Sequence, residues 1–258
     1  MKLVRASQNK FIALDDAENR AGSGIIRRRM LERVFPESPV QYEVEVKTTP
    51  EARDLLYAAA TTRARLLVSE EPKPCRAIVI VPKGREDELR LVENLGFKPK
   101  PGIIRMRRRI DNGEIYSELP GGLTEVKDYL ADKGEFMKCL TRFNECFGTS
   151  YDAAWLKELR ARRDFIRIMA VSSRGIGGEA LLWSAKGTGY VEVIQTARAW
   201  RRKGVATALL EAARRCFDEM GLKYMEILAW ADAPGCLKMC RRAGFDKVEI
   251  TEYHAIME

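Results

Sequence analysis

The pattern of hydrophobic and polar positions predicts two elements in the stretch from residue 190 to residue 220. Residues 190–196 read as a strand. From residue 205 apolar side chains recur at steps of three and four, so they share one face of a helix; they are Val205, Leu209, Ala212, Cys216 and Met220. Gly221 follows as a helix stop. The stretch therefore predicts a strand, a short basic loop and a long amphipathic helix.

The loop at 201–206 contains three cations and one glycine, Gly204. The first amides of a helix have no partner within the helix, and the helix dipole places partial positive charge on them. A glycine lets an anion approach the backbone closely. The loop is therefore a candidate binding site for a pyrophosphate.

The loop sequence Arg-x-x-Gly-x-Ala resembles motif A of the GNAT acetyltransferase superfamily. The residues that follow the helix extend this likeness: an apolar stretch at 224–230, then Asp232, then a short helix that ends in Gly244-Phe245. They resemble the family's strand, Asn, second helix and closing Gly-Phe. The resemblance covers residues 115–258. It implies an α/β (α+β) fold, with a mixed, mostly antiparallel sheet flanked by helices.

The first half of the chain shows a similar order of patterns. We expect strands at 2–7, 11–15, 42–46, 76–81 and 103–110, and helices at 25–35, 50–68 and 86–95. Three landmarks recur at one offset: Tyr42 and Tyr190 (190 − 42 = 148), Gly96 and Gly244 (244 − 96 = 148), and the residues just before the middle strands, 75 and 223 (223 − 75 = 148). A constant offset predicts an internal repeat, and hence two tandem GNAT-like units.

The turn signal Asp111-Asn112-Gly113-Glu114 separates these units, so the expected domains are residues 1–111 and 112–258. At the offset of 148, Leu56 falls on the position of Gly204, and Asp54 lies beside it. A bulky side chain blocks the approach of an anion to the backbone, and a carboxylate repels it. We therefore expect the first unit not to bind coenzyme A, but to pack against the second unit or to shape its substrate cleft.

The second unit is expected to begin with a strand at 115–119. One or two helices follow at 123–147, interrupted near Gly134, and another helix at 152–163. Strands at 165–172 and 179–184 are joined by the glycine-rich turn 175–178. This strand, helix, helix, strand, strand order is that of the GNAT superfamily ahead of its cofactor-binding strand.

The resemblance implies acetyl-CoA as co-substrate and assigns its contacts. The strand before the loop would diverge from its neighbour, and Ile194 and Thr196 would bind the pantetheine arm through backbone groups. The pyrophosphate contacts would come from Arg201, Arg202, Lys203, Gly204, Val205, Ala206 and Thr207. Asp232 stands where the family often has an Asn that bonds the pantetheine arm.

Glu192 is the candidate general base, because it lies on the strand that would reach the acyl group. A period of two places it on one face with Tyr190, Ile194 and Thr196, and burial would raise its pKa. The alternative is a carboxylate paired with an Arg of a neighbouring strand. Glu179 and Glu226 are further candidates of the same kind.

Cys240 is the candidate general acid, since it occupies the position where the family commonly has a tyrosine. A small cysteine reaches less far than a phenol, so a buried hydrophobic role is the alternative. Release of the thiolate to solvent, or a tyrosine elsewhere such as Tyr253, would also complete the reaction.

The composition limits the classes of partner that we expect for this chain. The net charge of +8 suits a polyanion such as coenzyme A. It would suit nucleic acid equally, but no basic stretch carries interleaved aromatic residues, and we do not expect nucleic acid as a partner. The absence of an 18-residue apolar run predicts no membrane span, and the start of the chain does not resemble a secretory signal. Six cysteines lie mostly in apolar segments, so we expect a cytoplasmic protein without a metal site.

The sequence thus predicts an acetyl-CoA-dependent N-acetyltransferase that acts on a primary amine. A non-catalytic acyl-CoA-binding or regulatory module is the main alternative, and a nucleic-acid-associated acetyltransferase is the third. The acceptor, a small molecule or a protein, is not specified. The oligomeric state is also open, because two units in one chain could replace a dimer, and a homodimer is the other possibility.

Overall fold

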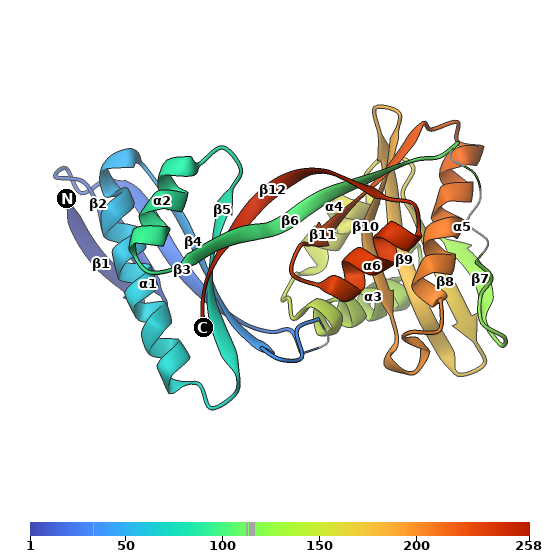
Figure 1. Ribbon diagram of the computed structural model, residues 1–258, viewed down its shortest axis with the longest axis horizontal. Helices are drawn as coiled ribbons and strands as arrows, with labels where there is room; N and C mark the ends of the chain where they lie inside the picture. The colour runs from blue at the N-terminus through green and yellow to red at the C-terminus, as the bar shows by residue number, and fades with distance from the viewer. Residues whose placement is uncertain (33, 112, 114–116) are drawn as a thin grey trace. The chain divides into compact units, whose positions relative to one another are not determined.

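The computed structural model describes residues 1–32, 34–111, 113 and 117–258. The chain forms two compact units (Figure 1). Unit 1 consists of Met1–Ile103 together with Ile250–Glu258, and unit 2 consists of Ile104–Glu249. None of the helices within the described ranges has the length and apolar character that crossing a membrane requires.

Unit 1 contains a mixed sheet in the order β1-β2-β3-β4-β5-β12. Its elements are β1 (Lys2–Ser7), β2 (Lys10–Leu14), β3 (Arg20–Met30), β4 (Val40–Thr48), η1 (Pro50–Ala52), α1 (Arg53–Glu70), β5 (Cys75–Pro82), α2 (Glu86–Asn94) and the start of β6 (Lys98–Arg109). Helix α1 buries Leu56, Tyr57 and Ala60 in a core that the strands complete. The last residues of β12 (Asp246–Met257) pair antiparallel with β5, from Glu252 opposite Pro82 to Met257 opposite Ala77.

Unit 2 contains strands in the order β6-β11-β10-β9-β8-β7. Its elements are β7 (Thr124–Asp128), α3 (Lys133–Phe147), α4 (Ala153–Arg160), β8 (Ile166–Ser172), β9 (Gly175–Ala185), β10 (Thr188–Thr196), η2 (Arg198–Trp200), α5 (Val205–Glu219), β11 (Tyr224–Trp230) and α6 (Pro234–Arg242). Strand β10 is parallel to β11 and antiparallel to β9. The expected mixed, mostly antiparallel sheet with flanking helices is confirmed.

The helices of unit 2 cover both faces of its sheet. On β9, Glu179 bonds to Arg142 of α3, whereas a Cβ at the preceding Gly178 would meet Val205 and Leu209 of α5. Successive side chains of a strand point to opposite faces. Helices α3 and α4 therefore lie on one face, called the α3/α4 face below, and α5 lies on the other.

Two long strands each begin in one unit and end in the other. Strand β6 starts in unit 1 and belongs to unit 2 from Ile104 onward, while β12 starts in unit 2 and belongs to unit 1 from Ile250 onward. Arg108 of β6 is buried in unit 2, where it bonds to Glu211 of α5. Each unit is thus completed by a strand from the other half of the sequence, which a single division after residue 111 does not describe.

The structure repeats at the offset read from the sequence. Strands β4 and β10 begin and end 148 residues apart (188 − 40, 196 − 48). The same offset relates η1 to η2 (198 − 50), α2 to α6 (234 − 86) and β6 to β12 (246 − 98). These matches support the internal repeat.

The helix expected at 25–35 is wrong, because Arg20–Met30 form strand β3. This strand pairs along its length with β4, from Gly22 opposite Thr48 to Met30 opposite Val40. The basic residues that suggested a helix face carboxylates of β4, where Arg27 pairs with Glu45 and Arg29 with Glu43. Cross-strand pairs of opposite charge stabilise a sheet.

The start of unit 2 also differs from the expectation. The strand expected at 115–119 falls partly on residues 115 and 116, which lie outside the described residues. The segment read as helix from 123 contains strand β7, and α3 begins only at Lys133, after its cap Asp132. The side chain of Asp132 accepts a hydrogen bond from the amide of Glu135, which fixes this helix start. The glycines at 175–178 belong to β9 and not to the turn before it.

Candidate active site

The loop between β10 and α5 is open to an incoming anion. Gly204 is the N-cap of α5 and has a left-handed backbone with φ of 88°, and no side chain caps the helix there. A Cβ at this position would meet nothing within 4 Å. Arg202 is also left-handed, with φ of 62°. The first amides of α5, from Val205 to Thr207, therefore point from the helix end toward accessible space.

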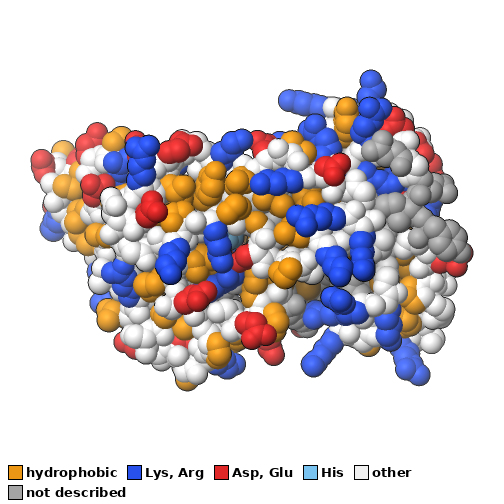
Figure 2. Space-filling model, in the orientation of Figure 1, with side chains coloured by type: hydrophobic (Ala, Val, Ile, Leu, Met, Phe, Trp, Pro, Cys, Tyr) orange, Lys and Arg blue, Asp and Glu red, His pale blue; other side chains and the backbone are white. Residues whose placement is uncertain are grey.

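Three cations surround this helix end. Arg202 and Lys203 are exposed, and the ammonium of Lys203 lies 5.1 Å from the ring centroid of Trp200. Arg201 is held by a bond from its Nε to the carbonyl of Thr196, at 3.3 Å. The face of the molecule in Figure 2 is mixed, with basic side chains interleaved with acidic and apolar ones. The loop combines positive side chains with free helix amides, which suits a pyrophosphate.

Strands β10 and β11 separate beside this loop. They pair in parallel from Thr188 opposite Tyr224 to Val191 opposite Ile227. Both strands continue further, to Thr196 and Trp230, but among the described residues this ladder stops at Val191. A gap therefore opens between the two strands on the side of the phosphate loop.

Backbone N–H groups of β10 face this gap. Ala197 donates its N–H to the carbonyl of Gly177 at 2.9 Å, in the direction of β9. Groups two residues apart along a strand point the same way, and neighbours point oppositely. The N–H groups of Ile194 and Thr196 therefore point toward the gap, as the expected pantetheine contacts require.

A bulge at Glu192 changes the faces of the sheet to which the following side chains of β10 point. The pairing with β9 passes from Val191 opposite Leu182 to Val193 opposite Leu181, so Glu192 is the additional residue. A Cβ at Gly189 would meet the ring of Phe217 in α5. Val193, four residues on, instead packs in the core on the α3/α4 face. The expectation that Glu192, Ile194 and Thr196 share one face is therefore wrong, because it assumed an unbroken period of two.

Glu192 is exposed, so the burial expected for it does not occur. Its carboxylate accepts hydrogen bonds from the indole N–H of Trp183, at 2.8 Å, and from Arg162, at 3.0 Å. The guanidinium of Arg162 lies 4.3 Å from the centroid of Trp183, and Trp183 stacks on Tyr190 at 4.2 Å. The alternative of an Arg partner thus holds, although Arg162 lies in the loop after α4 and not on a strand.

The other carboxylates considered as bases are occupied. Glu179 is buried and accepts bonds from Arg142 at 2.7 and 3.0 Å. Glu226 is also buried and accepts a bond from Nε of Arg107 at 2.7 Å. A buried carboxylate that already pairs with a guanidinium is poorly placed to accept a substrate proton.

Cys240 is fully buried on α6. A hydrogen bond with Cys236, one helical turn earlier, and burial both raise the pKa of Cys240. This environment favours the buried hydrophobic role over that of a general acid. Tyr253 lies on the part of β12 that pairs with β5 in unit 1. Asp232 is half-buried in the turn between β11 and α6, beside the end of the strand that borders the gap.

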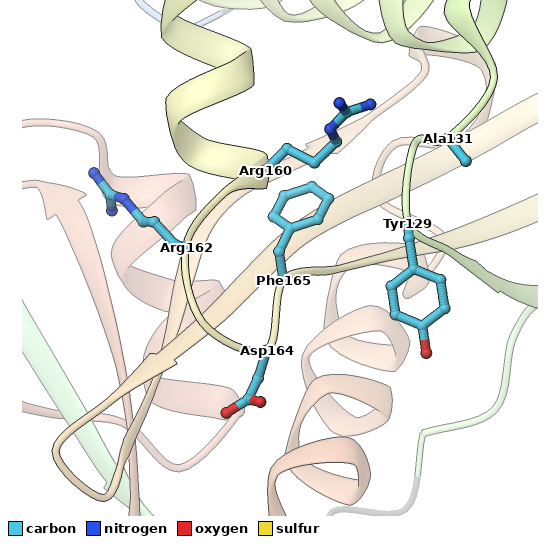
Figure 3. A pocket seen from close by; sticks show the side chains of 6 residues that line it. All are labelled: Tyr129, Ala131, Arg160, Arg162, Asp164 and Phe165. Carbon is cyan, nitrogen blue, oxygen red and sulfur yellow. The ribbon is translucent and has the colours of Figure 1, made fainter.

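A pocket of ≈ 570 Å³ lies where α4 ends and β8 begins (Figure 3). It is lined by Tyr129, Ala131, Arg160, Arg162, Asp164 and Phe165. Arg160 and Arg162 extend to opposite sides of the Phe165 ring (Figure 3). Since Arg162 also bonds to Glu192, this pocket adjoins the bulge on the α3/α4 face.

Unit 1 lacks the equivalent loop. Helix α1 begins at Arg53, which corresponds to Arg201 (201 − 148), so one additional helical turn replaces the loop. Leu56, at the position of Gly204, is fully buried and lies against Gly22 of β3. The pairing of β3 with β4 runs without a register shift. In the described residues, unit 1 therefore has neither the open helix end nor the bulge.

Comparison with known proteins identifies the fold. Residues 138–245 match the model of the acetyltransferase (GNAT) family, a region that contains β10, the loop, α5 and β11. No curated protein matches the chain. A GCN5-related N-acetyltransferase from Sphaerobacter thermophilus is 19% identical with a TM-score of 0.55, and the match covers 98% of this chain and 81% of that one.

Two further solved structures share the fold over nearly the whole chain. A tandem GNAT protein from the clavulanic acid biosynthesis pathway is 12% identical with a TM-score of 0.51, covering 96% of this chain and 81% of that one. A GCN5-related N-acetyltransferase from Anabaena variabilis is 10% identical with a TM-score of 0.57. The match covers 96% of this chain and 62% of that one. At such identities the likeness concerns the fold alone.

Proposed function

We propose that this chain, which carries a GNAT acetyltransferase domain at residues 138–245, transfers the acetyl group of acetyl-CoA to a primary amine. The observation that carries the proposal is the combination in unit 2 of an uncapped helix end at Gly204 with the gap between β10 and β11. The first feature suits a pyrophosphate and the second suits the extended arm that follows it.

The cofactor contacts follow from this geometry. Amides of Gly204 to Thr207, with the side chains of Arg201, Arg202 and Lys203, would bind the pyrophosphate. The N–H groups of Ile194 and Thr196 would bind the pantetheine arm in the gap, and Asp232 would lie at its far side. The acyl group would then lie near the bulge, where the strand turns its backbone toward the α3/α4 face.

The reaction has three steps. The acceptor ammonium loses a proton, its nitrogen attacks the thioester carbon, and the carbon–sulfur bond breaks to release a thiolate that is then protonated. We assign the first step to Glu192, directly or through a water molecule, because it is the exposed carboxylate at the bulge. Since Cys240 is buried, protonation of the thiolate by solvent is the simpler last step.

Unit 1 has a different role in this proposal. Its additional helical turn and the buried Leu56 support the expectation that it does not bind coenzyme A. Its contribution is structural, since it supplies the first part of β6, a strand that continues into unit 2. We therefore expect each chain to bind one molecule of coenzyme A.

The experiment that tests the proposal measures thiol release from acetyl-CoA with a panel of small amines, amino acids, peptides and proteins. Release that depends on one class of amine, with the acetylated amine identified by mass spectrometry, would support it. Binding of acetyl-CoA without turnover across the panel would favour the rival, a non-catalytic acyl-CoA-binding module. Absence of binding would contradict both.

A further inference from the structure

A buried cluster of charges connects helix α3 with the part of β10 that follows the bulge. Glu179 of β9 lies at its centre and is 1% exposed. Arg142 of α3 donates to both of its oxygens, from Nε to Oε1 at 2.7 Å and from Nη2 to Oε2 at 3.0 Å. The amide Nε2 of Gln195 on β10 donates to Oε1 at 2.6 Å. One carboxylate thus bonds to a helix and to the neighbouring strand.

A second guanidinium also lies against this carboxylate. Arg167 of β8 is completely buried, and its Nη1 lies 3.5 Å from Oε2 of Glu179. Its Nε donates to Asp128 of β7 at 2.8 Å. Glu179 is therefore held between two arginines that lie on different elements. Bidentate and charge-assisted bonds of this kind are strong and geometrically specific, so the position of the carboxylate is well determined.

Gln195 reaches Glu179 only because Glu192 is accommodated in a bulge. If β10 ran as a regular strand through Glu192, the Gln195 side chain would point to the α5 face, as a Cβ at Gly189 does. Gln195 also lies between Ile194 and Thr196, whose N–H groups face the gap. A bond that holds the Gln195 side chain on the α3/α4 face therefore fixes the direction of both N–H groups.

We propose that Gln195 and Glu179 are positioning residues for acyl-CoA. Their hydrogen bond holds β10 in the orientation in which the N–H groups of Ile194 and Thr196 face the pantetheine arm. This inference rests on the proposed function, because it assumes that the arm lies between β10 and β11. It adds two residues that do not touch the cofactor, and it gives the bulge a defined purpose.

Gln195→Ala is the informative variant. It removes the bond to β10 and leaves the ion pairs of Glu179 with Arg142 and Arg167 in place, whereas a substitution of Glu179 would take a charged partner from both arginines, of which Arg167 is completely buried, and endanger folding. We expect the Kd for acetyl-CoA to rise about tenfold, the effect of losing roughly one hydrogen bond. The KM for acetyl-CoA should rise in parallel, while kcat at saturation should change by less than about twofold.

A second measurement does not depend on the cofactor. Hydrogen exchange of the backbone amides at 193–197 in the free protein should be faster in Gln195→Ala than in the unmodified chain. The matched control is Ser184→Ala, which removes a side-chain bond to Asp164 from the same strand β9. Ser184 lies opposite Gly189, before the bulge, and among the described residues its side chain makes no bond to 193–197. The control should leave both the exchange at 193–197 and the Kd unchanged.

The outcomes distinguish a failure of the positioning role from a failure of the proposed function. If the unmodified chain binds acetyl-CoA and Gln195→Ala binds it equally well, the positioning role is refuted while the proposed function stands. Unchanged exchange at 193–197 would refute it too, as would an equal loss of affinity in Ser184→Ala. If the unmodified chain does not bind acetyl-CoA at all, the proposed function fails, and this role fails with it.

Discussion

Gly189 and Val193 face opposite sides of the sheet, although four residues separate them along β10. In a regular strand they would share a face. The additional residue between them is Glu192, an exposed carboxylate that directly follows the last residue paired with β11. The irregularity of the strand and the candidate chemistry thus coincide at one position.

Glu192→Gln should lower kcat about 100-fold, which is within the range for the loss of a general base. The Kd for acetyl-CoA should not change, since the carboxylate belongs to the acceptor side. Steady-state kinetics with the best amine from the panel, together with a binding titration, would check this. Glu158→Gln, an exposed residue of α4, is the control and should leave kcat unaltered. A kcat within twofold of the original in Glu192→Gln would remove Glu192 from the mechanism.

Cys240→Ala should leave kcat within about twofold and lower the free energy of unfolding by about 1 kcal/mol, the usual effect of a small change in a core. Cys216→Ala is matched to it, because Cys216 is another buried thiol on a helix of unit 2. Denaturant unfolding and kinetics of both variants would test this. A large loss of kcat in Cys240→Ala alone would restore the general-acid role.

Glu211→Ala should lower the free energy of unfolding by about 3–5 kcal/mol, because it leaves two buried cations without their shared partner. Arg108 of β6 donates to Glu211 at 3.1 Å, and Arg214 donates to it at 2.6 Å. Glu219→Ala, an exposed position on the same helix, is the control. Chemical denaturation measures both. A loss below about 1 kcal/mol would mean that the end of β6 does not anchor in unit 2 through this pair.

Asp128→Asn should reduce the dependence of stability on pH in acid. Burial alone would raise the pKa of Asp128, but the bond and the charge of Arg167 outweigh it, and the pKa lies below its ordinary value. A depressed pKa stabilises the fold above the unfolded-state value and loses this effect as the pH falls through the folded-state value. Unfolding free energies measured between about pH 5 and 2 should therefore fall less steeply in the variant. Equal slopes would contradict this.

The sequence predicted the parts of the fold that depend on local patterns. The amphipathic period at 205–219, the glycine stops and the constant offset of 148 all correspond to elements of the structure. The helix expected at 25–35 failed because a run of arginines has no period of its own, and its partners, Glu43 and Glu45, lie on another strand. Pairing with β4 therefore determined the secondary structure of that segment.

Two features of the site could not be read from the sequence. A bulge adds one residue to one strand, and only the pairing with the partner strand reveals it, as Val191 opposite Leu182 and Val193 opposite Leu181 do here. The exchange of β6 and β12 between the units is equally invisible, because a strand pattern does not specify its neighbour. The signal that could have suggested the Glu179 cluster was the pair of buried-strand charges, Arg167 and Glu179, in otherwise apolar segments.

The most direct test of the account is the affinity for coenzyme A, and the number of sites, in Gly204→Glu and Gly221→Glu. Both glycines belong to the ends of α5, both have a left-handed backbone, and a Cβ at either would meet nothing within 4 Å. The two variants therefore carry the same strain and the same added charge, and differ in which helix end they alter.

Isothermal titration of the unmodified chain should give one site per chain. Gly204→Glu should weaken binding by roughly 100-fold or more, because a carboxylate then occupies the place of the pyrophosphate. Gly221→Glu should bind as the unmodified chain does. Undiminished affinity in Gly204→Glu, or a second site that this variant leaves intact, would contradict the account.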